Sequence, residues 1–283
     1  MLVTTEKMFA DAKKGRYAVP APDFWDQTSC RIFVKTAEKL HAPIILSFAE
    51  IHLPYLDLSE AASLGGFYAK KADVPVALHL DHGVRFDVIE EAIDRGFTSV
   101  MIDASSDPFA ENVRKTKEAV KMAHEKGVVV EAEIGHVGVN PGDVREENES
   151  IYTEVSEAVQ FVKETGVDSL AVSIGTSHGL YKGTPVINFE RLAELKEAVS
   201  VPLVLHGGSS SGDDNLSRCA KGGIAKINLY TDFIVAAKKT AAGKLSAEED
   251  AIWPDILSAS SEAVSKVLTH YYKVFNLVGV SLT

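Results

Sequence analysis

The sequence has few cysteines and few basic residues, and both shortages limit what the protein can do. Its 283 residues include two cysteines, Cys30 and Cys219. These are too few and too far apart for a disulfide framework or a Cys-x-x-Cys metal site, which suits a reducing compartment. Twenty-nine Lys and Arg residues face 40 Asp and Glu residues, for a net charge of −11. That balance argues against nucleic acid or an anionic membrane as the main partner, because either would require a basic face.

Long apolar runs are also missing from the sequence. No uncharged stretch reaches the roughly 20 residues that a membrane-spanning helix needs, and the first 20 residues lack the apolar core of a signal peptide. We therefore expect a cytoplasmic protein with no membrane partner. What the chain does have is apolar residues, 46% of the total, enough to build a large core.

Short apolar runs rich in β-branched residues recur along the chain, with amphipathic stretches between them. This alternation is typical of parallel strands that are buried on both faces and connected by helices. Residues 112–127, for example, have helical periodicity and end at Gly127, a fitting helix stop. The predicted strands cover residues 17–21, 43–48, 75–80, 98–103, 128–134, 169–175, 202–207 and 224–229.

Eight strand–helix units in a chain of this length predict a (β/α)₈ TIM barrel. We expect one domain over residues 1–283, with a C-terminal helical extension from about Ala241 that packs outside the barrel or against another subunit. A doubly wound sheet is the alternative. It would normally carry a glycine-rich fingerprint after its first strand, and the sequence "YAVPAPDFWD" has none.

Three predicted strands end in a His–Gly pair: "LDHG" (80–83), "TSHG" (176–179) and "VLHG" (204–207). Because the C-terminal ends of barrel strands meet at one rim, His82, His178 and His206 should converge. Three imidazoles and an open fourth position make a catalytic Zn²⁺ site, whereas any one of them alone would be better explained as a hydrogen-bonded rim residue. His79 lies within a strand and is expected to pack there. The remaining histidines lack this placement and are treated as structural or surface residues: His41, His52, His124, His136 and His270.

Asp81 directly precedes one of the candidate metal ligands. A carboxylate at the edge of a metal site is well placed to act as a general acid/base, while the metal stabilises negative charge. The alternative is that Asp81 caps a helix or accepts a hydrogen bond from a ligating imidazole.

Two further segments favour phosphate binding. "HGGSSSG" (206–212) precedes a predicted helix, and "INLYTD" (227–232) places Asn228 and Thr231 after the last strand. Backbone N–H groups at such helix starts bind anions, and the loops after strands 7 and 8 are the usual phosphate site of these barrels. Either segment alone is equally well explained as an ordinary turn.

The residues closely resemble those of a known family. The similarity covers nearly the whole chain and identifies it as similar to the class II, metal-dependent ketose-bisphosphate aldolases, which cleave fructose or tagatose 1,6-bisphosphate in carbohydrate metabolism, including glycolysis. The resemblance implies a Zn²⁺-stabilised enediolate of dihydroxyacetone phosphate, which adds reversibly to an aldehyde. It also implies a homodimer or homotetramer. The segments that carry it are "VPVALHLDHG", "GVDSLAVSIGTSHGLYKGTP", "FERLAEL", "VPLVLHGGS" and "KINLYTD".

The resemblance also implies roles for individual residues. The matching histidines of the family, at His82, His178 and His206, bind Zn²⁺, and the aspartate that matches Asp81 moves the proton on the C4 oxygen. A monovalent cation, Na⁺ or K⁺, often lies beside the substrate phosphate. Asp103 and Glu133 match acidic residues near the metal that sometimes hold a second ion; equally, they are buried carboxylates hydrogen-bonded within the barrel. The matches to the dihydroxyacetone-phosphate end are Gly179, Gly207, Ser209, Asn228 and Thr231.

The sequence departs from the family pattern mainly at the acceptor end of the substrate. Asp23 stands where the family usually has asparagine, and a carboxylate there would disfavour a second anionic group. Ala49 and Glu50 follow the second strand, where the family commonly has a small hydroxyl residue. The final residues, "NLVGVSLT", lack the basic residue that many relatives place near the second phosphate. The metal and triose-phosphate end therefore looks intact and the acceptor end altered.

The loop that follows Gly135 also departs from the family, which has a Gly-Gly and an acidic cluster there. Here the loop reads "HVGVNPGDVREENE". The resemblance implies that a residue of this loop removes the substrate C–H proton, and the candidates are Asp143, Glu146 and Glu147.

Two other functions are compatible with the same residues. Lys226 on the eighth strand could form a Schiff base with a ketose, although a strand-end or packed lysine explains it more simply. A sugar-phosphate binder that kept the barrel and lost its chemistry is the other alternative, and the altered loop and Asp23 support it.

Overall fold

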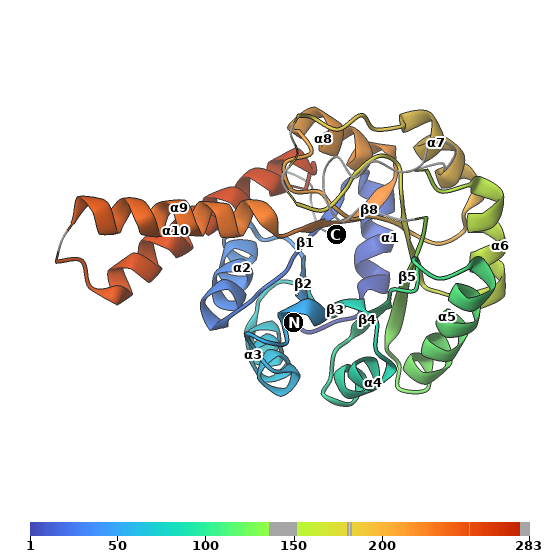
Figure 1. Ribbon diagram of the computed structural model, residues 1–283, viewed down its shortest axis with the longest axis horizontal. Helices are drawn as coiled ribbons and strands as arrows, with labels where there is room; N and C mark the ends of the chain where they lie inside the picture. The colour runs from blue at the N-terminus through green and yellow to red at the C-terminus, as the bar shows by residue number, and fades with distance from the viewer. Residues whose placement is uncertain (136–151, 180, 182, 249, 278–283) are drawn as a thin grey trace.

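The described residues of the protein form eight parallel strands that alternate with helices around a central barrel (Figure 1). The structure is a computed structural model, and it describes residues 1–135, 152–179, 181, 183–248 and 250–277. The strands are β1 (Val19–Pro22), β2 (Ile44–Ala49), β3 (Val76–Gly83), β4 (Ser99–Ile102), β5 (Val129–Ile134), β6 (Ser169–Val172), β7 (Leu203–Leu205) and β8 (Ile224–Leu229). The helices are α1 (Thr5–Gly15), α2 (Gln27–Leu40), the 3₁₀ helix η1 (Glu50–His52), α3 (Leu58–Lys71), α4 (Phe86–Asp94), α5 (Phe109–His124), α6 (Val155–Thr165), α7 (Phe189–Ala198), α8 (Asp213–Gly222), α9 (Thr231–Ala247) and α10 (Trp253–Val274).

The strand order distinguishes the two predicted folds. Neighbours run β1-β8-β7-β6-β5-β4-β3-β2, so the first strand pairs with the last. The remaining gap between β1 and β2 is bridged at Asp23 and Ser47, where the amide of Phe24 donates to the carbonyl of Ser47 at 2.9 Å. The TIM-barrel prediction is confirmed and the doubly wound alternative is wrong. The strands are buried along almost all of their length, which explains why their sequences are continuous apolar runs.

The strand bounds differ from prediction in one informative place. The third strand is predicted over residues 75–80, yet β3 continues to Gly83. Its pairing with β4 shifts register between Leu80 and Gly83, and His82 has a positive φ of 46°. Such a bulge aims a side chain away from the regular alternation of a strand. The sequence pattern ended where the apolar residues ended, whereas the backbone pairing continues through the polar ones.

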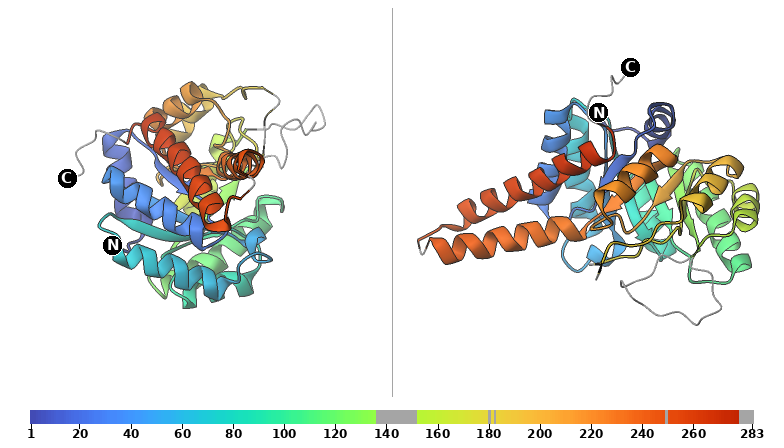
Figure 2. Two further views of the ribbon diagram at one scale, coloured as in Figure 1. Left: turned by 90° about the vertical axis from the view of Figure 1, so that its left-hand side faces the viewer. Right: turned by 90° about the horizontal axis from the view of Figure 1, so that it is seen from above.

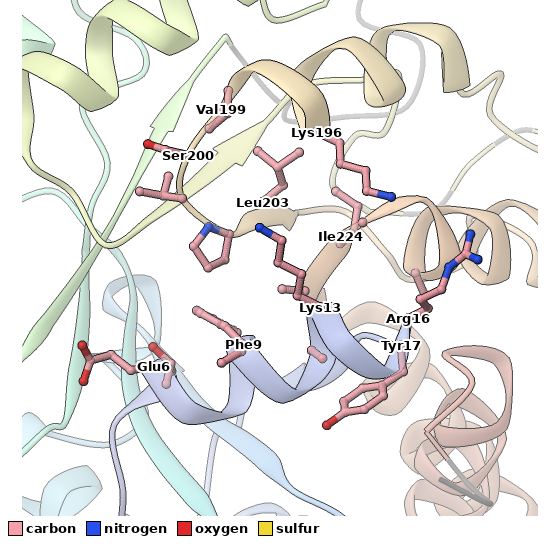
Figure 3. Close-up of a pocket in the computed structure, with 18 of the residues that line it drawn as sticks. Glu6, Phe9, Lys13, Arg16, Tyr17, Lys196, Val199, Ser200, Leu203 and Ile224 are labelled. Atoms are coloured by element: carbon pink, nitrogen blue, oxygen red, sulfur yellow. The ribbon is translucent and has the colours of Figure 1, made fainter.

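The N-terminal end of the barrel carries a pocket of about 340 Å³ between α1 and the starts of β7 and β8 (Figure 3). Phe9 of α1 and Leu203 of β7 contribute apolar side chains to it. Lys13, Arg16 and Lys196 are among its charged residues, and all three are exposed.

Helices α9 and α10 form a hairpin that projects from the side of the barrel (Figures 1 and 2). The hairpin starts earlier than the predicted extension, at Thr231 rather than near Ala241. Its base packs against α2, and Leu245 and Trp253 nearer its tip are 57% and 63% exposed. In the described part of the chain, no helix is long and apolar enough to cross a membrane.

Candidate active site

A pocket of about 840 Å³ opens at the C-terminal ends of the barrel strands. Of the predicted site residues, only the loop candidates Asp143, Glu146 and Glu147 lie outside the described residues. His206 is fully buried directly behind the pocket wall. All the others line the pocket: Asp23, Glu50, Asp81, His82, Asp103, Glu133, His178, Gly179, Gly207, Ser209, Asn228 and Thr231.

The three strand-end histidines converge, as the barrel geometry predicts. The ring centroid of His82 lies 5.0 Å from that of His178 and 4.6 Å from that of His206. One ring nitrogen from each falls within 4.8 Å of the other two. Gly207 makes this approach possible, because it has a φ of +68° and a Cβ atom there would lie 2.4 Å from the carbonyl oxygen of Ser177.

Carboxylates behind the histidines fix which nitrogen of each ring faces the centre. His82 donates from Nδ1 to Asp103 at 2.7 Å, and His206 donates from Nε2 to Glu131 at 2.9 Å. Both opposite nitrogens, Nε2 of His82 and Nδ1 of His206, then present lone pairs, and they lie 2.9 Å apart. Two lone pairs that close require a cation or a proton between them. The third ring has an unpartnered nitrogen, since Nε2 of His178 is buried with no hydrogen-bond partner in the described part of the chain.

These features fit a divalent metal ion of the zinc type. Zn²⁺ binds imidazole nitrogens at about 2.0–2.1 Å in tetrahedral geometry, which places two ligand nitrogens about 3.3 Å apart. The observed 2.9 Å is close to that spacing. Carboxylate partners on the outer nitrogens of ligating histidines are the usual support of such sites.

The charges around the histidines favour a cation at the same point. Burial opposes protonation of His82, but the carboxylates of Asp81 and Asp103 outweigh it and raise the pKa of His82 to about 10. Burial, followed by the neighbouring His82, lowers the pKa of His178 to about 3. The site therefore has three close nitrogens and enough negative charge to balance one positive ion.

Asp81 and Asn228 meet on the pocket floor. The Nδ2 of Asn228 donates to Oδ1 of Asp81 at 2.7 Å, and Oδ2 of Asp81 lies 3.9 Å from Nε2 of His82. Asp81 is buried, which disfavours its charge, yet His82 and then His79 lower its pKa well below the ordinary value. A charged carboxylate thus lies beside the converging histidine nitrogens and can exchange a proton with a bound molecule.

A buried ion pair supports the site from the barrel interior, and Glu131, one of its members, is absent from the sequence prediction. Nζ of Lys226 donates to both carboxylate oxygens of Glu131 at 2.8 Å and lies 3.0 Å from Nε2 of His79. His79 is fully buried and also bonded to Ser99, as expected for a packed histidine. Lys226 does not line the pocket, so it is poorly placed for a Schiff base. The period-2 alternation of β5 places Glu131 and Glu133 on the same inner face, a signal that could have found Glu131.

The two segments predicted for phosphate lie side by side after β7 and β8. The amide of Gly208 donates to the carbonyl of Asn228 at 3.1 Å, and the amide of Tyr230 donates to Oγ of Ser209 at 3.1 Å. Helix α9 begins immediately afterwards at Thr231. The arrangement brings backbone amides and a helix start to one side of the pocket, which suits an anion.

The pocket is also lined by Asp23, Glu50 and a residue that the sequence analysis assigned to structure or surface, His52. Oε2 of Glu50 accepts hydrogen bonds from the amides of Val84 and Arg85, at 2.7 and 3.2 Å. His52 lies in η1, the 3₁₀ turn after β2, which folds its ring back into the pocket. No spacing rule predicts that turn.

Comparison with known proteins gives consistent results. The family model described as "Fructose-bisphosphate aldolase class-II" matches residues 3–280. The crystal structure of the YdjI aldolase from Escherichia coli K12 is 34% identical, with a TM-score of 0.89 over 99% of both chains. A putative fructose-1,6-bisphosphate aldolase from Coccidioides immitis is 26% identical, with a TM-score of 0.85 over 96% of both chains. The fructose-bisphosphate aldolase of Campylobacter jejuni shares the fold at 21% identity, with a TM-score of 0.84 over 98% of this chain and 96% of that one.

Proposed function

Because the chain belongs to the class II fructose-bisphosphate aldolase family, whose members are aldehyde-lyases, we propose that it cleaves a ketose phosphate or bisphosphate reversibly to dihydroxyacetone phosphate and an aldehyde. One observation carries the proposal: three imidazoles converge at one point with the Asp81 carboxylate beside them. We further propose a cytoplasmic role in carbohydrate metabolism, including glycolysis.

The metal ion that the family requires would be held by His82, His178 and His206, and we propose Zn²⁺. When bound, Zn²⁺ supplies a Lewis acid that stabilises the negative charge developing on the substrate's ketone oxygen. Asp103 is assigned a supporting role, because it already orients His82. Asp103 and Glu133 could also hold a second cation together with His82, since the three offer ligand atoms within 4.8 Å of one another.

Asp81 is proposed to move the proton of the C4 hydroxyl. In cleavage its carboxylate takes that proton as the C3–C4 bond breaks, and in condensation it returns the proton to the new alkoxide. The hydrogen bond from Asn228 holds Asp81 in place without neutralising it. Removal of the C–H proton is assigned to one of the loop acids Asp143, Glu146 and Glu147.

The phosphate of the triose is proposed to bind between the β7 and β8 loops, at Gly179, Gly207, Ser209, Asn228 and Thr231. Backbone amides and the start of α9 supply the positive potential. Na⁺ or K⁺ beside the phosphate would add to it.

The protein is also proposed to be a homodimer or homotetramer. The helical hairpin of α9 and α10 presents exposed apolar side chains well outside the barrel, including Val235, Leu245 and Trp253. A second subunit is the simplest partner for such a projecting apolar surface.

A cleavage assay tests the proposed function. The purified, zinc-loaded protein is incubated with fructose and tagatose bisphosphates and with the corresponding 1-phosphates, and dihydroxyacetone phosphate is measured. We expect turnover. A chelator should abolish it and added zinc should restore it. Asp81→Ala should also abolish turnover, but the variant should still bind the triose phosphate. If the protein binds these sugar phosphates but cleaves none of the four, it is instead a non-catalytic sugar-phosphate binder. Unchanged turnover in the metal-free protein would overturn the mechanism.

A further inference from the structure

The part of the active-site pocket lined by Asp23 and by the 3₁₀ helix η1 has its own recognition chemistry. We propose that it binds the hydroxyl groups of an unphosphorylated aldehyde, so that the enzyme prefers a ketose 1-phosphate with a hydroxylated tail to a ketose bisphosphate. The inference rests on the proposed function, because it concerns the second product of the same cleavage.

Asp23 provides an unused acceptor. Its side chain lines the pocket and is only 6% exposed, and its Oδ1 has no hydrogen-bond partner within the described residues. A buried carboxyl oxygen without a partner costs free energy, which a ligand hydroxyl would recover. Burial, and then the charge of Asp81, raises the pKa of Asp23 well above the ordinary value. The protonated form that this favours can both donate to and accept from hydroxyl groups.

His52 provides a second unused polar atom in the same pocket. Its ring is 3% exposed and is held between Tyr230 and Phe48, with ring centroids 4.7 and 6.0 Å away. Its Nδ1 is buried and likewise has no partner among the residues that the structure describes. A neutral imidazole donates from one nitrogen and accepts at the other, so this atom suits a hydroxyl group in either role.

The charges in this part of the pocket disfavour a phosphate group. The carboxyl groups of Glu50 and Asp81 line this part of the pocket, and among the described lining residues the one Lys or Arg is Arg85. The guanidinium of Arg85 is already ion-paired with Asp87. A phosphate dianion would therefore enter a region with two carboxylates and no unpaired Lys or Arg in the described part of the lining, whereas neutral hydroxyls meet no such penalty.

The pocket also has room for a carbon chain beyond the triose. Ile51, Leu53, Pro54 and Val84 line it on the same side, and Ile51 and Val84 are 78% and 58% exposed at its mouth. The total volume of about 840 Å³ lies in the range of pockets that hold drug-sized ligands. Apolar side chains can cover the C–H edges of a sugar tail, while the buried polar atoms bind its hydroxyls.

Aldol condensation tests the inference, because dihydroxyacetone phosphate is then constant and only the aldehyde varies. We compare DL-glyceraldehyde with DL-glyceraldehyde 3-phosphate, which adds a phosphate, and with propanal, which lacks both hydroxyls. We expect kcat/KM for glyceraldehyde to exceed that for each of the other two by about tenfold or more, since one to two hydrogen bonds are at stake. A preference for the phosphorylated aldehyde would overturn this inference and leave the proposed aldolase intact. No condensation with any aldehyde would instead count against the proposed function.

Variants of Asp23 show whether this residue causes the preference. Asp23→Ala should lower the ratio of kcat/KM for glyceraldehyde to that for propanal about tenfold. Asp23→Asn keeps the shape and still offers a donor and an acceptor, and should lower that ratio less than Asp23→Ala does. Asp94→Asn is the matched control, because Asp94 is an acid paired with Lys126 on the outer surface. Equal losses for all three aldehydes in both Asp23 variants would show a structural role and overturn the assignment.

Discussion

The two ends of the barrel each carry a pocket, and the pockets differ in how their polar groups are solvated. At the C-terminal end several polar side chains are buried, and atoms of Asp23, His178 and Asn228 have no hydrogen-bond partner in the described part of the chain. At the N-terminal end (Figure 3) the charged side chains, such as Lys13 and Lys196, lie exposed around a largely apolar pocket.

The difference indicates that the pocket at the C-terminal end of the barrel is the one that binds a ligand. A polar atom that is buried without a partner costs about 1–3 kcal/mol, so a stable protein keeps few of them. A lysine whose ammonium group reaches water keeps its hydration, so it carries no such free-energy cost. Several such unpaired atoms together therefore indicate a binding site, whereas exposed lysine side chains around a pocket do not. Substitutions at four positions test this contrast.

The largest effect should come from His178, whose ring centroid lies 5.0 Å from that of His82 and whose Nε2 is buried without a hydrogen-bond partner in the described part of the chain. His178→Ala removes one of three nitrogens and should lower kcat for cleavage by more than about a hundredfold, a loss typical of a key electrostatic group. Zinc content by atomic absorption should fall in parallel. His124→Ala is the control, since His124 pairs with Asp168 on the exterior. Full activity in His178→Ala would remove the basis for the metal site.

Glu131→Gln should lower both the zinc affinity and the stability of the protein, because Glu131 supports the histidines from the barrel interior. It removes the charge that pairs with buried Lys226 and weakens the acceptor of the His206 ring. We expect zinc affinity to fall about 10–100-fold and the free energy of unfolding to fall by about 3–5 kcal/mol. Chelator competition and chemical denaturation measure the two effects.

Adding Lys226→Met to Glu131→Gln separates the two roles of Glu131. The double variant should recover stability, because no charge is left unpaired, yet it should keep the weakened zinc affinity. If zinc affinity recovers together with stability, Glu131 acts only through folding.

Asp103→Asn should have a smaller effect than Glu131→Gln, because Asp103 is closer to solvent and also accepts from Ser105. Asparagine can still accept from Nδ1 of His82, but without a charge. We expect about a tenfold loss of zinc affinity and little change in unfolding free energy. A thousandfold loss would mean that Asp103 binds the metal directly.

The smallest effect is expected at the other end of the barrel. Lys13→Ala should change the free energy of unfolding by less than about 0.5 kcal/mol, because Lys13 is exposed and forms no ion pair within the described residues. Cleavage activity should be unchanged. A clear loss of activity would show that the two ends communicate and would weaken the contrast between them.

The fold and the metal-site residues could be predicted because both follow from local pattern plus one rule of barrel geometry. Apolar runs mark the strands, and strand ends share a rim, so His82, His178 and His206 had to lie close together. Their roles as ligands stay a prediction, as do the single domain over residues 1–283 and the loop base.

The rest of the site depends on contacts that no local pattern encodes. The contact of Lys226 with Glu131 and His79 depends on the register of strands that are far apart in sequence. His52 enters the pocket through a 3₁₀ turn, and the bulge at the end of β3 turns His82. The period-2 rule gives the face of a side chain, not the partner across the barrel.

The projecting hairpin has a mechanical consequence. Helix α9 is 17 residues long, about 25 Å at 1.5 Å per residue, and its first turn adjoins the pocket. There Asp232 accepts from the amide of Ser210 and from the hydroxyl of Tyr271 in α10, so both arms of the hairpin are tied to the same turn. A rod anchored in this way is a lever. Because α10 also packs against α2, a load on the distant tip is shared between α2 and the loop that carries Ser210.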